Sequence, residues 1–422
     1  MKYLLKNANV FIDDRFVRKN VFVENGSVSS VSDAFPPVLE GVSVFDFNNC
    51  FVFPGFVDVH VHLREPGFFY KETIKSGTLA AAHGGFTSIC SMPNLDPVPD
   101  SLENLKAQTD IIERDAQVRV YPYGSITKGE KQRELSDMEK LAPYVIAFSD
   151  DGVGVQSYEM MEQAMKKAHS LGKLIVAHCE LNELLGGTAI HDGSYARKIG
   201  HRGISSESEW REVERDIELS RKTGCGLHIC HISTKESVDL VRQAKREGLD
   251  VSCETAPHYL ALCEEDLRDE GGFRMNPPLR GESDKLALLE GIADGTIDMI
   301  ATDHAPHSAE EKGRGVLKSL NGIVGLETAF PVLYTKLVRG GIISLEKLVE
   351  LMQKNPARRF GIGNALSSGQ PADLTVFDLN EQYVIKAEDF LSKGKSSPFI
   401  GEKVYGSCKL TISGGKTVWQ KD

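Results

Sequence analysis

The segment PGFVDVHVHLREPGFFYKETIKSGTLAAAHGGFTSICSMPN (54–94) decides the fold. It contains two apolar runs, FVDVHVH (56–62) and FTSICSM (86–92), separated by a stretch with helical and loop character. Apolar strands that alternate with helical segments predict parallel β/α units. Six further runs follow outward from this segment, at 118–124, 144–150, 173–179, 225–232, 249–255 and 297–304. Eight such units predict an α/β fold, a (β/α)8 TIM barrel.

The two ends of the chain have a different sequence pattern from the middle. Residues 1–52 and 365–422 contain short β-type runs broken by turn residues, and Asn25-Gly26 is a hairpin signal between two of them. We therefore predict that both ends join into one small β-sandwich domain beside a catalytic barrel of residues 53–364.

Composition and charge narrow the class of protein. Of 422 residues, 49 are basic and 60 acidic, and the formal charge of −11 argues against nucleic acid or an anionic membrane as partner. The stretch MKYLLKNANVFIDDRF has no sustained apolar run, so we expect neither a signal peptide nor a membrane anchor. The eight cysteines form no CxxC pair, which favours reduced thiols and a cytoplasmic location.

Metal-type ligands stand at the ends of the predicted strands. The active face of such a barrel is formed by the C-terminal ends of its strands. One histidine there is more often a hydrogen-bonded core residue, but several histidines and acids together would be costly to bury without a cation. The candidates are His60, His62, Asp150, Asp151, His178, His231 and Asp303.

Two ions explain this set better than one. His60, His62 and Asp303 are able to hold one ion, His178 and His231 a second. One of the two aspartates that end the fourth strand would bridge them. Imidazole and carboxylate are ligands that zinc and related divalent ions prefer. A water shared by two such ions is acidic enough to act as a nucleophile at neutral pH.

Several motifs carry a family resemblance in the same order along residues 4–420. HLREPG, MPN, AFSDDGVGV, IVAHCE, ICHIST, FRMNPPLR, GTIDMIATDHAPHSAEEK and NGIVGLETAF resemble segments of the dihydroorotases, in particular the class I bacterial type of the amidohydrolase superfamily. HxH alone indicates only an amidohydrolase. The resemblance implies two Zn²⁺ ions per subunit.

The resemblance also implies roles for individual residues. It places the bridging carboxylate at Asp151, because YVIAFSDDG has no lysine for the carbamylated bridge of many relatives. Asp303 would serve as the catalytic general base and acid. Arg64, Asn94 and His307 would bind the substrate carboxylate, and Asn276 would hydrogen-bond the pyrimidine ring.

The implied activity is the reversible closure of N-carbamoyl-L-aspartate to L-dihydroorotate, a small-molecule reaction of pyrimidine biosynthesis. The resemblance also implies a homodimer, with possible association with other enzymes of that pathway. We predict that segment 307–322, which is charged and contains glycines, orders over the substrate; the alternative is a solvated connector.

Two other functions stay open. A hydantoinase, dihydropyrimidinase or allantoinase would share the barrel and the metals, but HLREPG, MPN and NPPLR favour a substrate with a carboxylate. A non-catalytic scaffold protein would be expected to lack metal ligands, which this sequence retains.

Overall fold

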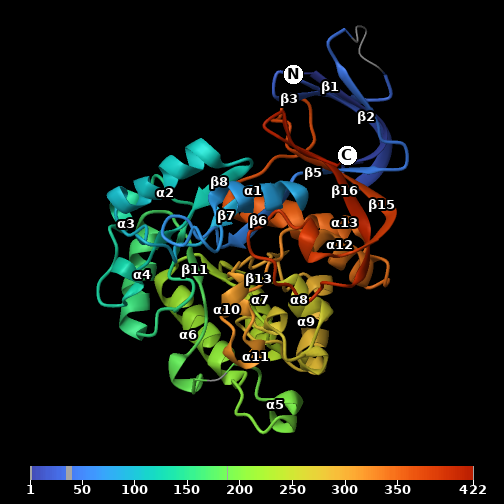
Figure 1. Cartoon of the computed structure of the whole chain (residues 1–422). Coiled ribbons are helices and arrows are strands. Elements are labelled where there is room, and N and C mark those ends of the chain that lie inside the picture. Colours follow the sequence, from blue (N-terminus) through green and yellow to red (C-terminus); the bar gives the residue numbers. More distant parts are fainter. Residues whose placement is uncertain (1, 35–39, 188, 422) are drawn as a thin grey trace.

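The computed structural model describes residues 2–34, 40–187 and 189–421. Its centre is a barrel of parallel strands (Figure 1). β8 and β9 flank Tyr123 and share one barrel position, because β8 pairs with β7 and β9 pairs with β10. The strands are β6 (Phe56–Val61), β7 (Phe86–Ser91), β8 (Arg119–Pro122), β9 (Gly124–Ser125), β10 (Phe148–Ser149), β11 (Ile175–Ala177), β12 (Leu227–Ile229), β13 (Val251–Thr255) and β14 (Met299–Ile300).

The barrel closes where its last strand meets its first. The His62 backbone N–H donates to the His304 carbonyl at 2.8 Å, and Val61 forms a parallel bridge with His304. The backbone N–H of Thr302 donates to the Asp58 carboxylate. All eight predicted barrel strands are present, and the predicted barrel fold is confirmed. The observed strands are shorter than the predicted runs at one or both ends. Most of the predicted ligands follow the end of their strand, whereas His60 lies within β6.

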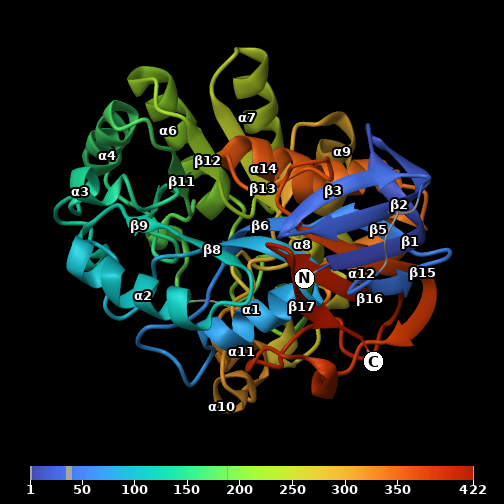
Figure 2. The same cartoon turned by 90° about the horizontal axis from the view of Figure 1, so that it is seen from above.

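Helices surround the barrel on its outside (Figure 2). Ser157 caps α4 by accepting a hydrogen bond from the Met160 N–H, and α6 ends at Gly224, whose φ of 72° suits glycine.

No helix in the described ranges is long and apolar enough to cross a membrane. The helices are α1 (Ile74–His83), α2 (Leu102–Asp115), α3 (Met138–Leu141), α4 (Tyr158–Ser170), α5 (Ser194–Lys198), α6 (Glu207–Thr223), α7 (Lys235–Arg246), α8 (Pro257–Ala261), α9 (Glu282–Asp294), α10 (Ala309–Lys312), α11 (Gly315–Lys318), α12 (Ala329–Leu333), α13 (Leu345–Val349) and α14 (Asn355–Phe360).

Both chain ends contribute to a second sheet beside the barrel (Figure 1). The predicted turn at Asn25 and Gly26, with φ of 52° and 83°, joins β2 to β3. Antiparallel pairing of β15 with β5 brings the two ends together. The strands are β1 (Lys2–Ile12), β2 (Arg15–Glu24), β3 (Ser27–Ser32), β4 (Ser43–Asp46), β5 (Phe51–Pro54), β15 (Leu374–Val384), β16 (Lys403–Ser413) and β17 (Lys416–Gln420).

This sheet differs in one respect from the expected sandwich. Hydrogen bonding runs continuously through all eight strands, because β1 pairs first with β4 and then, past an irregularity between Leu5 and Ala8, with β5. The division into 1–52 with 365–422 and 53–364 stays a prediction, and residues 1, 35–39 and 422 of the small domain lie outside the described residues.

An aromatic cluster joins the sheet to the barrel. Phe53 of β5 and Phe377 of β15 contact Phe330 of α12, with ring centroids 5.3 Å and 4.2 Å apart, and Phe56 of β6 lies 5.3 Å from Phe330. All four side chains are buried. Because buried aromatic rings contribute strongly through apolar area and packing, this cluster stabilises the junction.

We expect Phe377→Ala to lower the free energy of unfolding by about 3–5 kcal/mol, because it removes a buried ring and leaves a cavity. Urea denaturation followed by circular dichroism measures the change. Phe69→Ala is the control, since Phe69 is 62% exposed, and it should change stability by less than about 0.5 kcal/mol. Equal midpoints for the two variants would contradict the role given to the cluster.

Candidate metal centre

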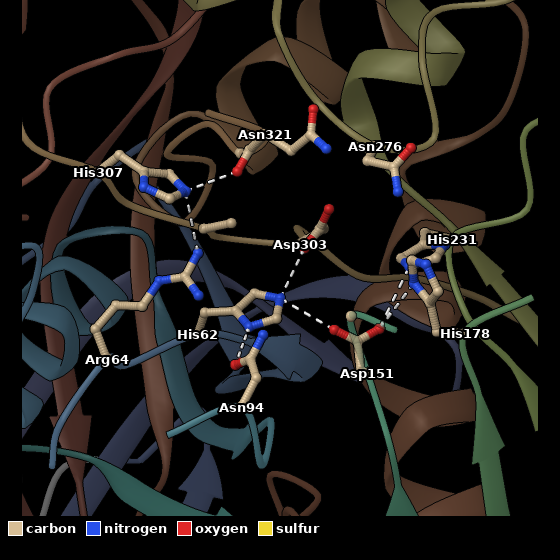
Figure 3. A pocket seen from close by; sticks show the side chains of 13 residues that line it. His62, Arg64, Asn94, Asp151, His178, His231, Asn276, Asp303, His307 and Asn321 are labelled. Carbon is tan, nitrogen blue, oxygen red and sulfur yellow. Dashed lines mark hydrogen bonds and ion pairs between the residues drawn. The ribbon is translucent and has the colours of Figure 1, made fainter. Parts of the chain in front are cut away.

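The predicted site residues meet at the mouth of the barrel. Counting Asp151 as the bridge, ten residues were predicted, and nine of them line a cavity of about 180 Å³. The tenth, His60 of β6, is fully buried, with its Nε2 3.3 Å from Asp151 Oδ2. The ligand candidates come from the ends of β6, β10, β11, β12 and β14. The lining residues are His62, Arg64, Asn94, Asp151, Gly152, His178, His231, Asn276, Asp303, Ala305, His307, Asn321 and Gly322 (Figure 3).

Asp151 lies between two pairs of imidazoles. Its Oδ2 is 3.3 Å from the Nε2 atoms of His60 and His62. Its Oδ1 is 3.3 Å from His178 Nδ1 and 3.4 Å from His231 Nε2. One carboxylate therefore offers a separate oxygen to each pair, which is the geometry that a bridge between two cations requires.

The neighbouring Asp150 points elsewhere. Its Oδ1 accepts hydrogen bonds from the backbone N–H groups of Ile126 and Thr127 at 2.7 and 3.1 Å, and its Oδ2 accepts from the Thr127 hydroxyl. Burial raises the pKa of Asp150 to about 7 despite these bonds. Successive side chains of an extended chain face opposite ways, so only one of the two aspartates reaches the imidazoles.

Asp303 faces the first imidazole pair. Its Oδ1 is 3.2 Å from His62 Nε2 and 3.6 Å from His60 Nε2. Burial alone would raise the pKa of Asp303, but the hydrogen bond with His62 and the nearby His60 lower it to about 2. Asp303 is therefore a carboxylate at neutral pH. The backbone of Asp303 has a φ of 48°, and Arg64 and His231 also have positive φ values. Such strained backbone conformations cluster at functional sites.

This set of donors fits divalent cations. The ligand atoms of His60, His62 and Asp303 lie within 4.8 Å of one another, as do those of His60, Asp151 and His231. Among the described residues, the buried atoms His60 Nε2, Asp151 Oδ1 and His178 Nε2 have no hydrogen-bond partner. Against the effect of burial, Asp151 and Glu180 raise the pKa of His178 to about 10. The carboxylates thus favour positive charge in the cluster. A bound metal ion would supply that charge while the imidazoles stay neutral.

Two further residues behind the cluster were not predicted from the sequence. His60 Nδ1 is 2.7 Å from Glu254 Oε1, and the other oxygen of Glu254 is 3.1 Å from His228 Nε2. Metal-bound histidines commonly donate their second nitrogen to a carboxylate, which fixes the tautomer and the ring orientation. Glu254 thus directs His60 Nε2 toward Asp151. A glutamate within the apolar run 249–255 is the signal that could have indicated it.

Asn94 orients the other histidine of the first pair. Its Oδ1 is 2.8 Å from His62 Nδ1, so it accepts a hydrogen bond from that nitrogen and leaves His62 Nε2 for the cluster. The amide group of Asn94 still has its two N–H donors. Asn94 therefore has a positioning contact that the sequence did not indicate, in addition to the substrate contact predicted for it.

The opposite wall of the cavity is cationic. Arg64 Nε donates to the Pro306 carbonyl at 3.3 Å, and no ion pair among the described residues involves Arg64. Burial, Arg64 and Lys71 lower the pKa of His307 to about 3, so that its imidazole is neutral. His307 Nε2 lies 2.7 Å from the Asn321 carbonyl and donates to it. Lys71, whose Nζ is 3.2 Å from His307 Nδ1, was also not predicted.

Asn276 lies across the cavity from Arg64, with Asp303 between them (Figure 3). Its Nδ2 donates to Glu180 Oε2 at 3.0 Å, and the same oxygen is 3.5 Å from His178 Nε2. Glu180 thus connects one candidate metal ligand with one candidate substrate residue. The structure brings all ten predicted residues to one site, and their individual roles stay predictions.

Comparisons with known proteins agree with this site. A family model described as "Dihydro-orotase-like" matches residues 50–237. A protein of Fusobacterium nucleatum named "Dihydroorotase" is 48% identical over 99% of this chain and 98% of its own length. One of the same name from Bacillus thuringiensis is 47% identical over 100% and 99%. Among solved structures, the L-hydantoinase (dihydropyrimidinase) from Arthrobacter aurescens is similar, with a TM-score of 0.87 and 27% identity over 99% of this chain and 96% of that one.

We expect Asp151→Asn to lose most of its bound metal and to weaken metal affinity by roughly 100-fold or more, because it removes the charge shared by both imidazole pairs. Asp150→Asn is the matched control and should keep its metal, since that side chain only accepts hydrogen bonds from 126 and 127. Elemental analysis after dialysis measures both. Equal metal loss in the two variants would contradict the assignment of the bridge to Asp151.

We expect Glu254→Gln to weaken metal binding by about 10–100-fold, because the amide supports the His60 tautomer less well than the carboxylate does. Competition with a chromogenic chelator measures the affinity. Glu264→Gln, which changes a buried carboxylate that is not among the cavity residues, should bind metal as the unmodified protein does. Unchanged affinity in Glu254→Gln would mean that Glu254 has only a packing role.

Proposed function

Because the chain belongs to the dihydroorotase family, we propose that it catalyses the reversible cyclisation of N-carbamoyl-L-aspartate to L-dihydroorotate, with loss of water. The chain is a metal-dependent cyclic amide hydrolase. One observation carries the choice of substrate: a buried arginine without a carboxylate partner faces the same cavity as the metal-ligand cluster. A planar guanidinium in that place suits a substrate that carries a carboxylate.

The proposed metal sites use the two imidazole pairs. His60, His62 and Asp303 would hold one zinc ion, and His178 and His231 would hold the other. Asp151 would bridge them, as its distances to both pairs support. When bound, the ions acidify a water molecule into a nucleophile and polarise the ring amide carbonyl.

The cationic wall orients the substrate. Arg64 would grip the carboxylate with two parallel hydrogen bonds, and an Asn94 N–H would donate to it because the Asn94 oxygen is already used by His62. His307 is the third member of this proposed site: its Nε2–H, which donates to the Asn321 carbonyl in this structure, would donate to the substrate carboxylate instead. Asn276 would hydrogen-bond the ring from the opposite side. Holding the carboxylate at one side places the amide bond over the metal ligands, and such alignment lowers the barrier by proximity.

Asp303 would move the proton. Its low pKa keeps it ionised at neutral pH, which is the form that can accept a proton. In hydrolysis it takes the proton of the attacking water and delivers it to the departing ring nitrogen; in synthesis it accepts a proton from the carbamoyl nitrogen. His62, at 3.2 Å, holds the carboxylate in place.

A second candidate activity is that of a hydantoinase or dihydropyrimidinase, favoured by the similarity to the Arthrobacter aurescens structure. Hydantoin and dihydrouracil carry no carboxylate, so Arg64 would face a neutral ring and remain a buried unpaired charge. This cost favours dihydroorotate. The convergence of every candidate ligand likewise favours an enzyme over a scaffold.

We further propose the class I bacterial type, on the basis of Asp151 in place of a bridging lysine. The eight buried free cysteines support a reducing, cytoplasmic location. A homodimer, and contact with other enzymes of pyrimidine synthesis, are proposed from the family resemblance.

The test is a comparison of substrates. We expect the protein with zinc to open dihydroorotate with a kcat/KM roughly 10³-fold or more above those for hydantoin, dihydrouracil and allantoin, because only dihydroorotate pairs with Arg64. Ultraviolet absorbance follows each ring opening. Arg64→Met should remove most of this preference, chiefly by raising KM. A preference for a substrate without a carboxylate would overturn the proposal.

Asp303→Asn serves as the control for binding without turnover. It should bind dihydroorotate in calorimetry while retaining no more than a few per cent of kcat. Substantial turnover by this variant would assign the proton transfer to another group.

A further inference from the structure

Lys312 is a buried lysine whose ammonium group contacts only backbone carbonyls. It lies at the end of α10 with 6% of its surface exposed. Its Nζ donates to the carbonyls of Arg274, Leu320 and Gly322 at 2.9, 2.8 and 2.6 Å. No ion pair among the described residues involves Lys312. All three N–H donors of the ammonium therefore have a backbone acceptor.

These carbonyls belong to the two chain segments that form one side of the cavity. Arg274 stands two residues before Asn276, and Leu320 and Gly322 flank Asn321. Asn276, Asn321 and Gly322 all line the cavity. The Gly322 N–H also donates to the Arg274 carbonyl at 3.1 Å, so the two segments already touch at the point that Lys312 holds.

The same loop holds the histidine of the proposed carboxylate site. The Asn321 carbonyl, between the two carbonyls that Lys312 binds, accepts the hydrogen bond from His307 Nε2. A shift of residues 320–322 would therefore move His307 and Asn321 together. Through this loop, the ammonium of Lys312 influences the position of groups that face the substrate, although it does not contact the metal-ligand residues.

The backbone of Lys312 is also fixed. Its carbonyl accepts a hydrogen bond from Ser319 Oγ at 2.9 Å. A Cβ at Gly271 would lie 1.9 Å from that carbonyl, so the chain passes Gly271 too closely for any side chain there. The backbone of Lys312 is thus fixed while its ammonium binds the three carbonyls.

An apolar side chain would fill the space of the Lys312 side chain at a lower free-energy cost, because no charge would be buried. Burial and the nearby Arg274 lower the pKa of Lys312 to about 7, which reflects the cost of keeping a charge there. Burying an ammonium is unfavourable unless its hydrogen bonds are made. A structural filler would not need the charge, so the three carbonyl contacts are the reason for a lysine.

We propose that Lys312 is a positioning residue that clamps residues 274–276 to residues 320–322 and so sets the spacing of Asn276, His307 and Asn321 around the substrate. The identity of the substrate rests on the proposed function, whereas the clamp does not. Segment 307–322, predicted to order over the substrate, is already folded into α10 and α11 and anchored at Lys312; closure over a ligand stays a prediction.

Lys312→Met tests the clamp, because methionine has similar length and no donor. We expect KM for dihydroorotate to rise about tenfold or more, which corresponds to about 1.4 kcal/mol of binding, while kcat changes by less than about threefold. Bound metal should be unchanged. Trypsin cleavage after the exposed Arg314, followed by mass spectrometry, should accelerate because the loop is released.

Lys318→Met is the matched control, since Lys318 is exposed in the same segment, and it should leave KM and cleavage after Arg314 unchanged. Lys312→Arg keeps the charge but its planar fork cannot reproduce three convergent bonds, so it should give an intermediate KM. Should Lys312→Met fail to fold, Lys312→Arg decides the question. Wild-type KM and wild-type cleavage in the folded variants would overturn the clamp. If the unmodified protein does not act on dihydroorotate, the proposed function fails and the cleavage rates alone decide the clamp.

Discussion

The structure depends on a carboxylate buried between four imidazoles. Asp151 cannot be placed there without positive charge to balance it, and neither can Asp303 and Glu254 around it. The barrel brings ligands from five strands together around Asp151, so that each pair of imidazoles faces one of its oxygens. His231 and Asp303 take positive φ values to do so. The barrel core has apolar side chains below, whereas the mouth is stable only when its charge is balanced.

Among its described residues, the sheet from the chain ends contributes none to the cavity lining, yet it is connected to the barrel mouth. Its strand β5 leads through Gly55 directly into β6, and the Gly55 N–H donates to the Asp373 carbonyl at the edge of β15. The C-terminal segment also reaches the site from outside, because Ser392 Oγ donates to Glu72, which is 3.5 Å from His304 Nε2. His304 follows Asp303, so this contact from the segment between β15 and β16 supports the strand end that carries the proposed proton carrier.

The sequence could predict those features that depend on local pattern. Apolar runs indicated the eight strands, and a polar residue at a strand end indicated each ligand, because strand ends of a parallel barrel meet by topology alone. The role of Glu254 could not be predicted because it depends on a contact inside the barrel with His60, 194 positions away in the chain. The role of Lys312 could not be predicted for a similar reason: its partners are backbone carbonyls, which every residue has. The choice between Asp150 and Asp151 needed the direction of two adjacent side chains, which the chemistry of the residues does not specify.

The charges of the site are separated in space, and this separation would make the proposed site selective for one orientation of the substrate. On one side, carboxylates and imidazoles create a demand for cations. On the other, Arg64 has no carboxylate partner and lies beside a neutral His307, while Lys71 is paired with Glu311 at 3.1 Å. A substrate that carries an anionic group at one end and a polarisable amide at the other is bound in one orientation only, because the reverse orientation would place its carboxylate against Asp151 and leave Arg64 unpaired. Like charges brought together in a cavity from which water is excluded are strongly unfavourable. In the proposed reaction Arg64 would therefore align the reacting bond, and the carbonyl contacts of Lys312 would keep the facing chain segments in place.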